Sequence, residues 1–347
     1  MKVLIIKITS MGDILHTFPA LTAAKAARPE VSFDWVVAPE FADLLQLHPA
    51  VSQAIPCPIR RWRGHYWQAL QQGEVWDFIK NLRQKRYDVI IDAQSALKSA
   101  VIGKIARGAQ SGYDKNSVRE YGAHWFYTQR FAVEKQQHAV TRLCSLFAKA
   151  LLYPIDPHAP ENFGIDFTRL PTTTLLVPAE YVMIIPNTTW PTKHWPDAHW
   201  NALLQKMNPN GIAALIPWGN ALEKQRAEGL AANNRNVFVL PKLTLMECAS
   251  LIAKAKAAVC VDTGLGHLAA ALGTPAIHLY GPTHPEKIGA RGPAQIALNS
   301  RTHCKPTCKR ICHFTQMPSE QAQCLQDLSV DEVWQKLTTL LQQSSIS

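Results

Sequence analysis

Short apolar runs alternate with longer amphipathic segments along the whole chain. The apolar runs have the length of buried strands, and the segments between them repeat their apolar residues with the period of a helix. The pattern predicts strands at 3–8, 32–37, 89–92, 181–185, 213–217, 257–261 and 276–280, and in the first half it predicts helices at 14–27, 67–85 and 97–107. This alternation predicts an α/β fold with parallel sheets covered by helices on both faces.

The chain is long enough for two hydrophobic cores, because 347 residues exceed the size at which a single core keeps growing. A proline-rich stretch from Tyr153 to Pro178 is typical of a linker. We therefore expect a Rossmann-like domain at 1–160, a linker at 161–180, a second Rossmann-like domain at 181–325 and a C-terminal helix at 326–347.

The C-terminal helix is predicted to open with a capping box from Ser329 to Glu332. Its apolar residues recur with helical spacing at Val330, Val333, Trp334, Leu337 and Leu341. One face of this helix must be buried, and we expect it to pack back against the first domain.

The segment 259–283 has the pattern of a phosphate-binding site. A strand ends at Asp262, Gly264 and Gly266 predict a turn, and an alanine-rich helix follows. The first amides of such a helix are unpaired and its dipole is positive there, so it attracts anions. The segment also satisfies the loose dinucleotide pattern, but the next strand ends without the acidic residue that holds a ribose. Asp262, Thr263 and His267 are polar side chains that a dinucleotide turn does not need.

A second glycine turn follows the first predicted strand, at 9–16. Asp13 then lies at the carboxyl edge of the first sheet, where open α/β sheets bind their ligands. Two interpretations stay open here: Asp13 caps the helix, or it serves as a general base.

The net charge of +10 indicates a polyanionic partner. The densest cluster is Arg60-Arg61-Trp62-Arg63, and the remaining charge is spread over the chain. No nucleic-acid-binding motif is present, and no apolar segment has the length of a membrane span or the pattern of a signal peptide. We therefore expect a cytoplasmic protein that does not bind nucleic acid.

The chain has eight cysteines. Four of them are scattered among apolar residues and are expected to pack as small apolar side chains. The other four form a C-x3-C-x3-C-x11-C series, at Cys304, Cys308, Cys312 and Cys324. Either a structural zinc site or reduced thiols in a loop would fit this spacing, which departs from the usual pairs of zinc ligands.

Taken together, the motifs of the chain resemble the lipopolysaccharide heptosyltransferases. The resemblance is carried in order by 10–13 with 15–21, 91–94 with Lys98 and Ser99, 188–189 with 193–196, 217–219, and 262–264 with His267 and 280–283. It covers nearly the whole chain. It implies the GT-B fold, in which two Rossmann-like domains with parallel sheets face each other across a cleft.

The resemblance also implies the roles of individual residues. The second domain would bind the donor ADP-heptose through Thr188, Thr189, Lys193, Glu223, Leu243, Asp262, Thr263, Gly264 and His267. The first domain would bind the acceptor, Kdo2-lipid A, through Arg60, Arg61, Arg63, Lys98 and Arg119. One departure concerns the position after 91–94, where the family usually has glycine and this chain has Ser95.

The expected chemistry is an inverting displacement with Asp13 as general base, and no cofactor or metal is expected. The motifs 10–13 and 60–63 favour the type I enzyme, which adds the first heptose to Kdo, whereas the late cysteine series favours type II, which acts on an acceptor that already carries a heptose. A nucleotide-dependent dehydrogenase and an anion-binding module are more remote alternatives. A lipid-anchored acceptor and a positive charge imply docking on an anionic membrane, at the cytoplasmic face of the inner membrane.

Overall fold

The structure is a computed structural model that describes residues 1–156, 161–302, 312 and 323–344. The chain divides into two compact units, Met1–Arg169 and Leu170–Ser347, each described here by itself. The division falls inside the predicted linker. The first part of that linker joins unit 1, where the Asp166 N–H donates to the Leu47 carbonyl (2.8 Å). The second part joins unit 2, where the Ser250 hydroxyl donates to the Pro171 carbonyl (2.7 Å).

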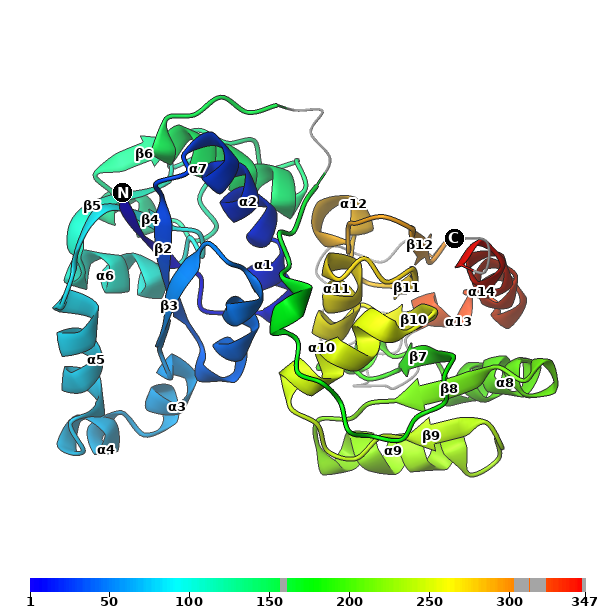
Figure 1. Cartoon of the computed structure of the whole chain (residues 1–347). Coiled ribbons are helices and arrows are strands. Elements are labelled where there is room, and N and C mark those ends of the chain that lie inside the picture. The colour runs from blue at the N-terminus through cyan, green and yellow to red at the C-terminus, as the bar shows by residue number, and fades with distance from the viewer. Residues whose placement is uncertain (157–160, 303–311, 313–322, 345–347) are drawn as a thin grey trace. The chain divides into compact units, whose positions relative to one another are not determined.

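Unit 1 is built on a parallel sheet in the order β3-β2-β1-β4-β5-β6 (Figure 1). The strands are β1 (Lys2–Ile6), β2 (Ser32–Val37), β3 (Val51–Pro56), β4 (Arg86–Asp92), β5 (Arg107–Tyr113) and β6 (Gln129–Phe131). The central strands β1, β2 and β4 were predicted from their apolar runs. The other three were not, because their sequences VSQAIP, RGAQSGY and QRF contain no continuous apolar run.

Helices cover both faces of the first sheet. They are α1 (Met11–Leu15), α2 (Phe18–Ala27), α3 (Ile59–Gly64), α4 (Tyr66–Gln71), α5 (Glu74–Arg83), α6 (Leu97–Ile105) and α7 (Ala139–Leu151). Side chains of α3 to α6 share one core cluster with β1 and β4, while α2 and α7 pack together elsewhere on the unit. The single helix predicted at 67–85 is wrong, because Gly73 adopts φ 78° and separates α4 from α5.

Unit 2 repeats this plan with a parallel sheet in the order β12-β11-β10-β7-β8-β9. The strands are β7 (Tyr181–Ile185), β8 (Ala213–Ile216), β9 (Val237–Val239), β10 (Ala257–Val261), β11 (Ala276–Tyr280) and β12 (Gln295–Asn299). Counted from the first strand of each unit, both sheets have the order 3-2-1-4-5-6 of a Rossmann fold. The predicted α/β fold with two Rossmann-like sheets is therefore confirmed.

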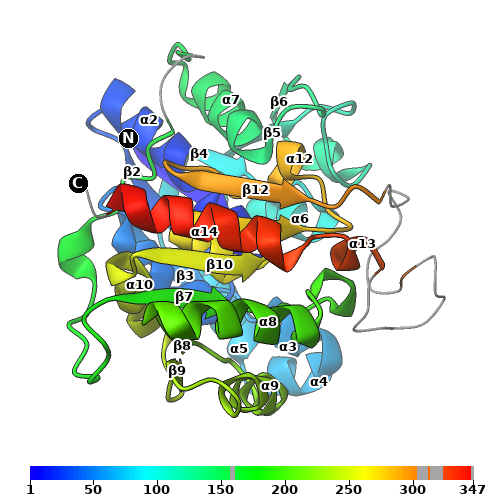
Figure 2. The ribbon, with the colours of Figure 1, turned by 90° about the vertical axis from the view of Figure 1, so that its right-hand side faces the viewer.

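The helices of unit 2 are α8 (Asp197–Met207), α9 (Ala221–Ala231), α10 (Leu245–Lys254), α11 (Gly264–Ala271), α12 (Pro285–Ile288), α13 (Gln323–Gln326) and α14 (Val330–Ser344). Figure 2 shows α14 and α8 side by side on one face of the second sheet. The buried apolar residues of α14 are Val333, Leu337 and Leu340, and they belong to the core cluster of this sheet. The buried apolar face of α14 therefore lies within unit 2, and the expectation that this helix packs back against the first domain stays a prediction.

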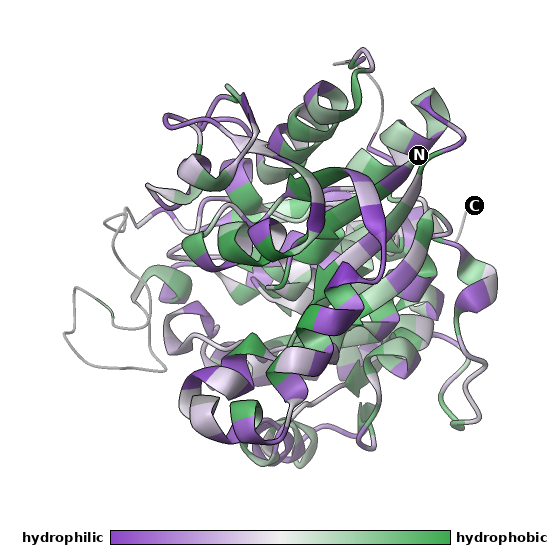
Figure 3. Cartoon of the chain, turned by 90° about the vertical axis from the view of Figure 1, so that its left-hand side faces the viewer, coloured by the Kyte–Doolittle hydropathy of each residue, from purple (hydrophilic) through white to green (hydrophobic). Residues whose placement is uncertain are grey.

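Individual helices carry hydrophilic and hydrophobic segments in alternation (Figure 3), as expected for helices with one face on a sheet. Within the described residues, no helix combines the length and the apolar character needed to cross a bilayer. Each sheet reverses its strand order once, between β1 and β4 in unit 1 and between β7 and β10 in unit 2. Ligands of open α/β sheets bind beyond the carboxyl ends of the strands at such a switch point.

Candidate active site

Asp13 lies in the loop and helix that follow β1, at the switch point of unit 1. The residue is the third of α1, and Ser10 is the N-cap. The Asp13 carboxylate oxygen Oδ2 accepts hydrogen bonds from the backbone N–H and the hydroxyl of Ser10 (3.0 and 2.9 Å). Asp13 thus stabilises the helix start from the third position and not as the N-cap, and its side chain remains 36% exposed.

Lys7 pairs with the other oxygen of Asp13. Its ammonium lies 3.3 Å from Oδ1 and also donates to the Ala93 carbonyl (3.1 Å). The Lys7 side chain is only 7% exposed. A buried ammonium needs such a partner, because an isolated charge is costly to remove from water.

Gln94 connects the two loops of the switch point. Its side-chain oxygen accepts hydrogen bonds from the N–H groups of Ile8 and Thr9 (3.0 and 3.1 Å), in the loop after β1. Its own N–H donates to Asp92 Oδ1 (3.0 Å) at the end of β4. The backbone that carries Asp13 is therefore held against β4 by paired polar groups.

The electrostatics of this site favour an ionised Asp13. Burial by itself would raise the pKa of the carboxyl, but the Lys7 ammonium, assisted by the Ser10 N–H, holds that pKa well below its usual range. The carboxylate is therefore charged throughout the physiological pH range and able to accept a proton.

A second polar cluster lies at the switch point of unit 2 and centres on Asp262. Its Oδ2 pairs with the Lys193 ammonium (2.6 Å) and accepts a hydrogen bond from the Thr283 hydroxyl (2.7 Å). His267 Nε2 lies 3.6 Å from Oδ1, and the Thr188 hydroxyl donates to the Asp262 backbone carbonyl (3.0 Å). The structure thus brings together four predicted donor-site residues from the loops after β7 and β10.

The Asp262 carboxylate is buried and ionised. Burial would raise its pKa, but the hydrogen bond with His267 and the Lys193 ammonium hold the pKa well below the usual range. Lys193 in turn lies over the Trp190 ring, with its nitrogen 4.5 Å from the ring centroid. Lys193 is 15% exposed, and its ion pair places a positive charge beside Asp262, the residue before the N-cap of α11.

Helix α11 begins earlier than predicted. Thr263 is the N-cap, and Gly264 is the first helical residue. Gly266 also belongs to the helix, so the glycine turn predicted at these two positions is wrong. A Cβ atom at Gly266 would lie 3.1 Å from Cys260 Sγ and 3.2 Å from His278 Nδ1, so this glycine allows the helix to pack closely on β10 and β11.

Three predicted donor residues lie apart from the Asp262 cluster. Thr189 and Glu223 line a cavity of about 740 Å³, which Thr188 also lines. Glu223 accepts a hydrogen bond from the Gly219 N–H (2.7 Å). Leu243 is half-buried between β9 and α10, and among the described residues no hydrogen bond or ion pair joins it to this cavity or to Asp262.

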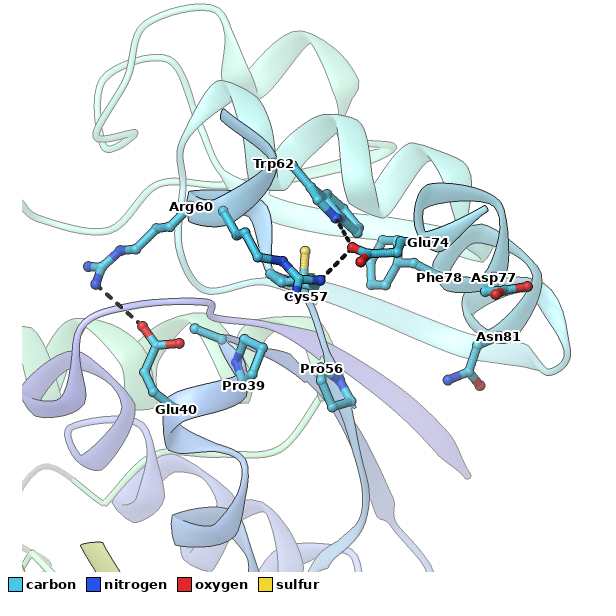
Figure 4. A pocket seen from close by; sticks show the side chains of 13 residues that line it. Pro39, Glu40, Pro56, Cys57, Arg60, Trp62, Glu74, Asp77, Phe78 and Asn81 are labelled. Atoms are coloured by element: carbon cyan, nitrogen blue, oxygen red, sulfur yellow. Dashed lines mark hydrogen bonds and ion pairs between the residues drawn. The ribbon is translucent and has the colours of Figure 1, made fainter. Parts of the chain in front are cut away.

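The predicted acceptor arginines lie on α3 in unit 1. Arg60 and Arg61 line a cavity of about 710 Å³. Figure 4 shows Arg60 directed toward Glu40 (3.4 Å) and the Trp62 indole directed toward Glu74, to which it donates a hydrogen bond (3.0 Å). Arg61 forms an ion pair with the same Glu74 carboxylate. Ion pairs this exposed contribute little to stability, so an incoming anion can replace the carboxylates at small cost.

The remaining predicted acceptor residues are exposed. Arg63 is on α3, Lys98 is on α6, and Arg119 follows β5. The Arg119 N–H donates to the Ser95 hydroxyl (3.0 Å), which ties its segment to the loop after β4.

Ser95 occupies a left-handed backbone conformation with φ 57°. This region favours glycine, the residue that the family resemblance leads us to expect at this position. The serine is held there by its N–H, which donates to Asp92 Oδ1 (2.9 Å).

The late cysteine series is only partly described. Cys312 and Cys324 are buried, whereas Cys304 and Cys308 lie outside the described residues. The described part of the chain contains no cluster of three or more side chains that could hold a metal ion, and both interpretations of the series, a structural zinc site and reduced thiols, stay open.

Two polar residues of these clusters received no role from the sequence. Lys7 is the single charged residue in the apolar run 3–8, and a lysine in a buried strand signals a nearby carboxylate. Thr283 is part of a motif that was noted, but its contact with Asp262 depends on the pairing of β10 with β11 and was not predictable from the spacing.

Comparisons with known proteins show which family the chain resembles over most of its length. A sequence model of glycosyltransferase family 9 (heptosyltransferase) matches residues 75–317. The chain is 44% identical to lipopolysaccharide heptosyltransferase 1 of Pseudomonas aeruginosa over 333 residues, which are 96% of this chain and 92% of that protein. It is 29% identical to lipopolysaccharide heptosyltransferase 2 of Salmonella typhimurium, over 82% of this chain and 84% of that one.

A solved structure is similar over almost the full length. It is the Escherichia coli heptosyltransferase WaaC with ADP-2-deoxy-2-fluoro heptose, at 39% identity and a TM-score of 0.83, covering 98% of this chain and 99% of that one.

Proposed function

Because the chain belongs to glycosyltransferase family 9, the heptosyltransferases, we propose that it transfers heptose from ADP-heptose to Kdo of Kdo2-lipid A. It is a glycosyltransferase of lipopolysaccharide synthesis. The observation that carries the type I assignment is the 44% identity to a heptosyltransferase 1 across 96% of the chain, against 29% to a heptosyltransferase 2.

The donor is assigned to unit 2. The similar WaaC structure contains an ADP-heptose analogue. In this chain, the Lys193 ammonium and the N-terminal end of α11 supply positive charge at one switch point, which suits a diphosphate. Thr188, Asp262, Thr263, Gly264 and His267 complete this part of the donor site. We assign Thr189, Glu223 and Leu243 to the nucleoside and sugar on the basis of the family resemblance.

The acceptor is assigned to unit 1. Kdo and lipid A carry carboxylates and phosphates, and Arg60 and Arg61 already bind carboxylates of the protein itself at the α3 cavity. A guanidinium binds carboxylate and phosphate in the same forked geometry. Arg63, Lys98 and Arg119 are exposed cations of the same unit and are proposed to contact the acceptor as well.

Asp13 serves as the general base. The Kdo hydroxyl oxygen attacks the anomeric carbon of heptose, the bond from that carbon to the phosphate oxygen breaks, and ADP departs with the electron pair. Asp13 takes the proton of the attacking hydroxyl, and the configuration at the anomeric carbon inverts. A nucleoside diphosphate leaves readily once its charge is stabilised, so one carboxylate suffices.

Membrane association follows from the acceptor. A lipid-anchored substrate and a net charge of +10 support peripheral docking on an anionic surface, which we place at the cytoplasmic face of the inner membrane.

The test is incubation with ADP-heptose and either of two acceptors, one ending in Kdo and one already carrying a heptose. Mass measurement of the products should show addition of one heptose to the Kdo-ended acceptor. A product formed only from the heptose-bearing acceptor would overturn the type I assignment in favour of type II.

A further inference from the structure

A cluster of large apolar side chains is exposed on unit 1, on α6 and the 3-10 helix η3 (Ala123–Phe126) with the loop before it. Its members are Leu97, Val101, Tyr121 and Trp125, which are 44, 43, 72 and 63% exposed. We call these four residues the aromatic patch. Exposed apolar residues are common one at a time, but a contiguous group indicates a binding surface.

The four side chains form one surface. The Tyr121 and Trp125 rings pack edge to face with centroids 5.8 Å apart. A Cβ atom at Gly122 would lie 3.3 Å from Leu97 Cδ2 and 3.4 Å from the Trp125 ring, so these two side chains flank the same glycine. Val101 follows Leu97 by one helical turn and shares its face of α6.

The backbone holds the patch in place. The Leu97 N–H donates to the Glu120 carboxylate (2.8 Å), and the Glu120 N–H donates to the Ser95 carbonyl (3.1 Å). The Arg119 N–H donates to the Ser95 hydroxyl (3.0 Å). The loop that carries the aromatic rings is therefore tied to the start of α6 at three points, and the rings are presented to solvent by a fixed scaffold.

Two exposed cations lie close to the patch in the sequence: Lys98 follows Leu97, and Arg119 lies two residues before Tyr121. Glu120, between Arg119 and Tyr121, uses its carboxylate to accept the Leu97 N–H. Tyrosine and tryptophan favour the boundary between water and lipid, and lysine or arginine beside them bind anionic head groups.

We propose that the aromatic patch docks on an anionic lipid bilayer. Tyr121 and Trp125 enter the head-group layer, and Lys98 and Arg119 bind the anionic head groups beside them. This inference rests on the proposed function, since a lipid-anchored acceptor must be reached at a membrane. The proposal names the surface that faces the lipid, which the family assignment does not specify. Lys98 and Arg119, proposed above as acceptor contacts, border this surface.

The test compares the full-length chain with the double variant Tyr121→Ser/Trp125→Ser in co-sedimentation with vesicles. One set of vesicles contains phosphatidylethanolamine and phosphatidylglycerol, and the other contains phosphatidylcholine alone. The wild type should bind the anionic vesicles, and the double variant should bind them about tenfold more weakly. Its melting temperature should be unchanged because both side chains are exposed.

Trp76→Ser provides the matched control. Trp76 is also 63% exposed and lies in unit 1, but Asp77 follows it on α5 and Glu74 precedes it in the same turn. Equal losses of vesicle binding in the control and the double variant would overturn the proposal. So would unchanged binding in the double variant, absence of binding by the wild type, or a wild-type dimer that the double variant abolishes.

Turnover with a water-soluble, de-acylated acceptor separates this proposal from the proposed function. The double variant should retain wild-type turnover there while losing vesicle binding. If neither protein turns over that acceptor although vesicle binding behaves as expected, the proposed function fails and the docking surface stands.

Discussion

Replacing Lys7 by methionine should expose the influence of its charge on the proposed catalytic base. Methionine keeps an unbranched side chain in this buried position and removes only the ammonium. The charge lies 3.3 Å from Asp13 Oδ1. At that distance two unit charges interact by about 1 kcal/mol in bulk water and about 5 kcal/mol at an effective dielectric constant of about 20.

Because the Asp13 side chain is 36% exposed, solvent screening places the interaction in the lower part of that range. A loss of about 1–3 kcal/mol corresponds to a rise of about 1–2 units in the pKa of Asp13. In the wild type this pKa is held well below its usual range, so protonation of Asp13 should not limit kcat between about pH 5 and 8. In Lys7→Met the pKa rises, and kcat should fall on the acid side as Asp13 gains a proton.

The assay is the pH dependence of kcat, measured as ADP release at saturating donor and acceptor. Lys85→Met is the control, since Lys85 forms another ion pair of unit 1, 2.6 Å from Asp34. The control should keep the wild-type profile. A folded Lys7→Met protein whose acid limb coincides with that of the wild type would refute the proposed coupling of Lys7 to the base.

Three further outcomes are expected. Arg226 donates to Asp197, to the Pro186 carbonyl and to the Trp195 carbonyl (2.7, 2.9 and 3.0 Å), so it fixes the loop that carries Thr188 and Lys193. Initial rates of Arg226→Gln should show a KM for ADP-heptose that rises more than kcat falls. Denaturant titration of the same variant should show a free energy of unfolding lower by about 3 kcal/mol. Burial raises the pKa of Asp92 to about 6 although four hydrogen bonds oppose the rise. The stability that the protonated Asp92 contributes is therefore present at acid pH and is lost as the pH rises through 6. Thermal unfolding at several pH values should show that Asp92→Asn lacks this pH dependence, which is worth at most about 3 kcal/mol. Ser95→Gly relieves a left-handed φ of 57° but removes the hydroxyl that accepts the Arg119 N–H. Because these effects oppose each other, the melting temperature of the variant should stay close to that of the wild type. A large fall in melting temperature would show that the Ser95 hydroxyl matters more than the backbone strain.

The core strands were predictable because each contains a run of mostly apolar residues. Strands buried on both faces of a parallel sheet have this pattern. The outer strands β6 and β9 span only three residues each, and β3 is half-exposed, so neither length nor hydropathy distinguishes them from loops. Their positions are determined by pairing with a neighbouring strand, which the local sequence does not encode.

The sequence predicted which two loops carry the candidate site residues, but it did not predict the contacts that these residues make. Asp13 and Asp262 each follow an apolar strand, and the sequence places both at sheet edges. Their ion pairs with Lys7 and Lys193 depend on how the loops fold back, over a separation of 69 residues in the second case. For Glu223, the structure shows a carboxylate that accepts a hydrogen bond from the Gly219 N–H. The proposed contact of Glu223 with the nucleoside rests on the family resemblance alone.

The most direct test of the central claim is the turnover of Asp13→Asn with ADP-heptose and a Kdo-ended acceptor, together with its affinity for the donor. The amide retains the size of the carboxylate but cannot take a proton. The account predicts unchanged donor affinity and a fall in kcat of about 10²- to 10⁴-fold. A variant that binds the donor normally and retains most of its turnover would contradict the assignment of Asp13 as general base.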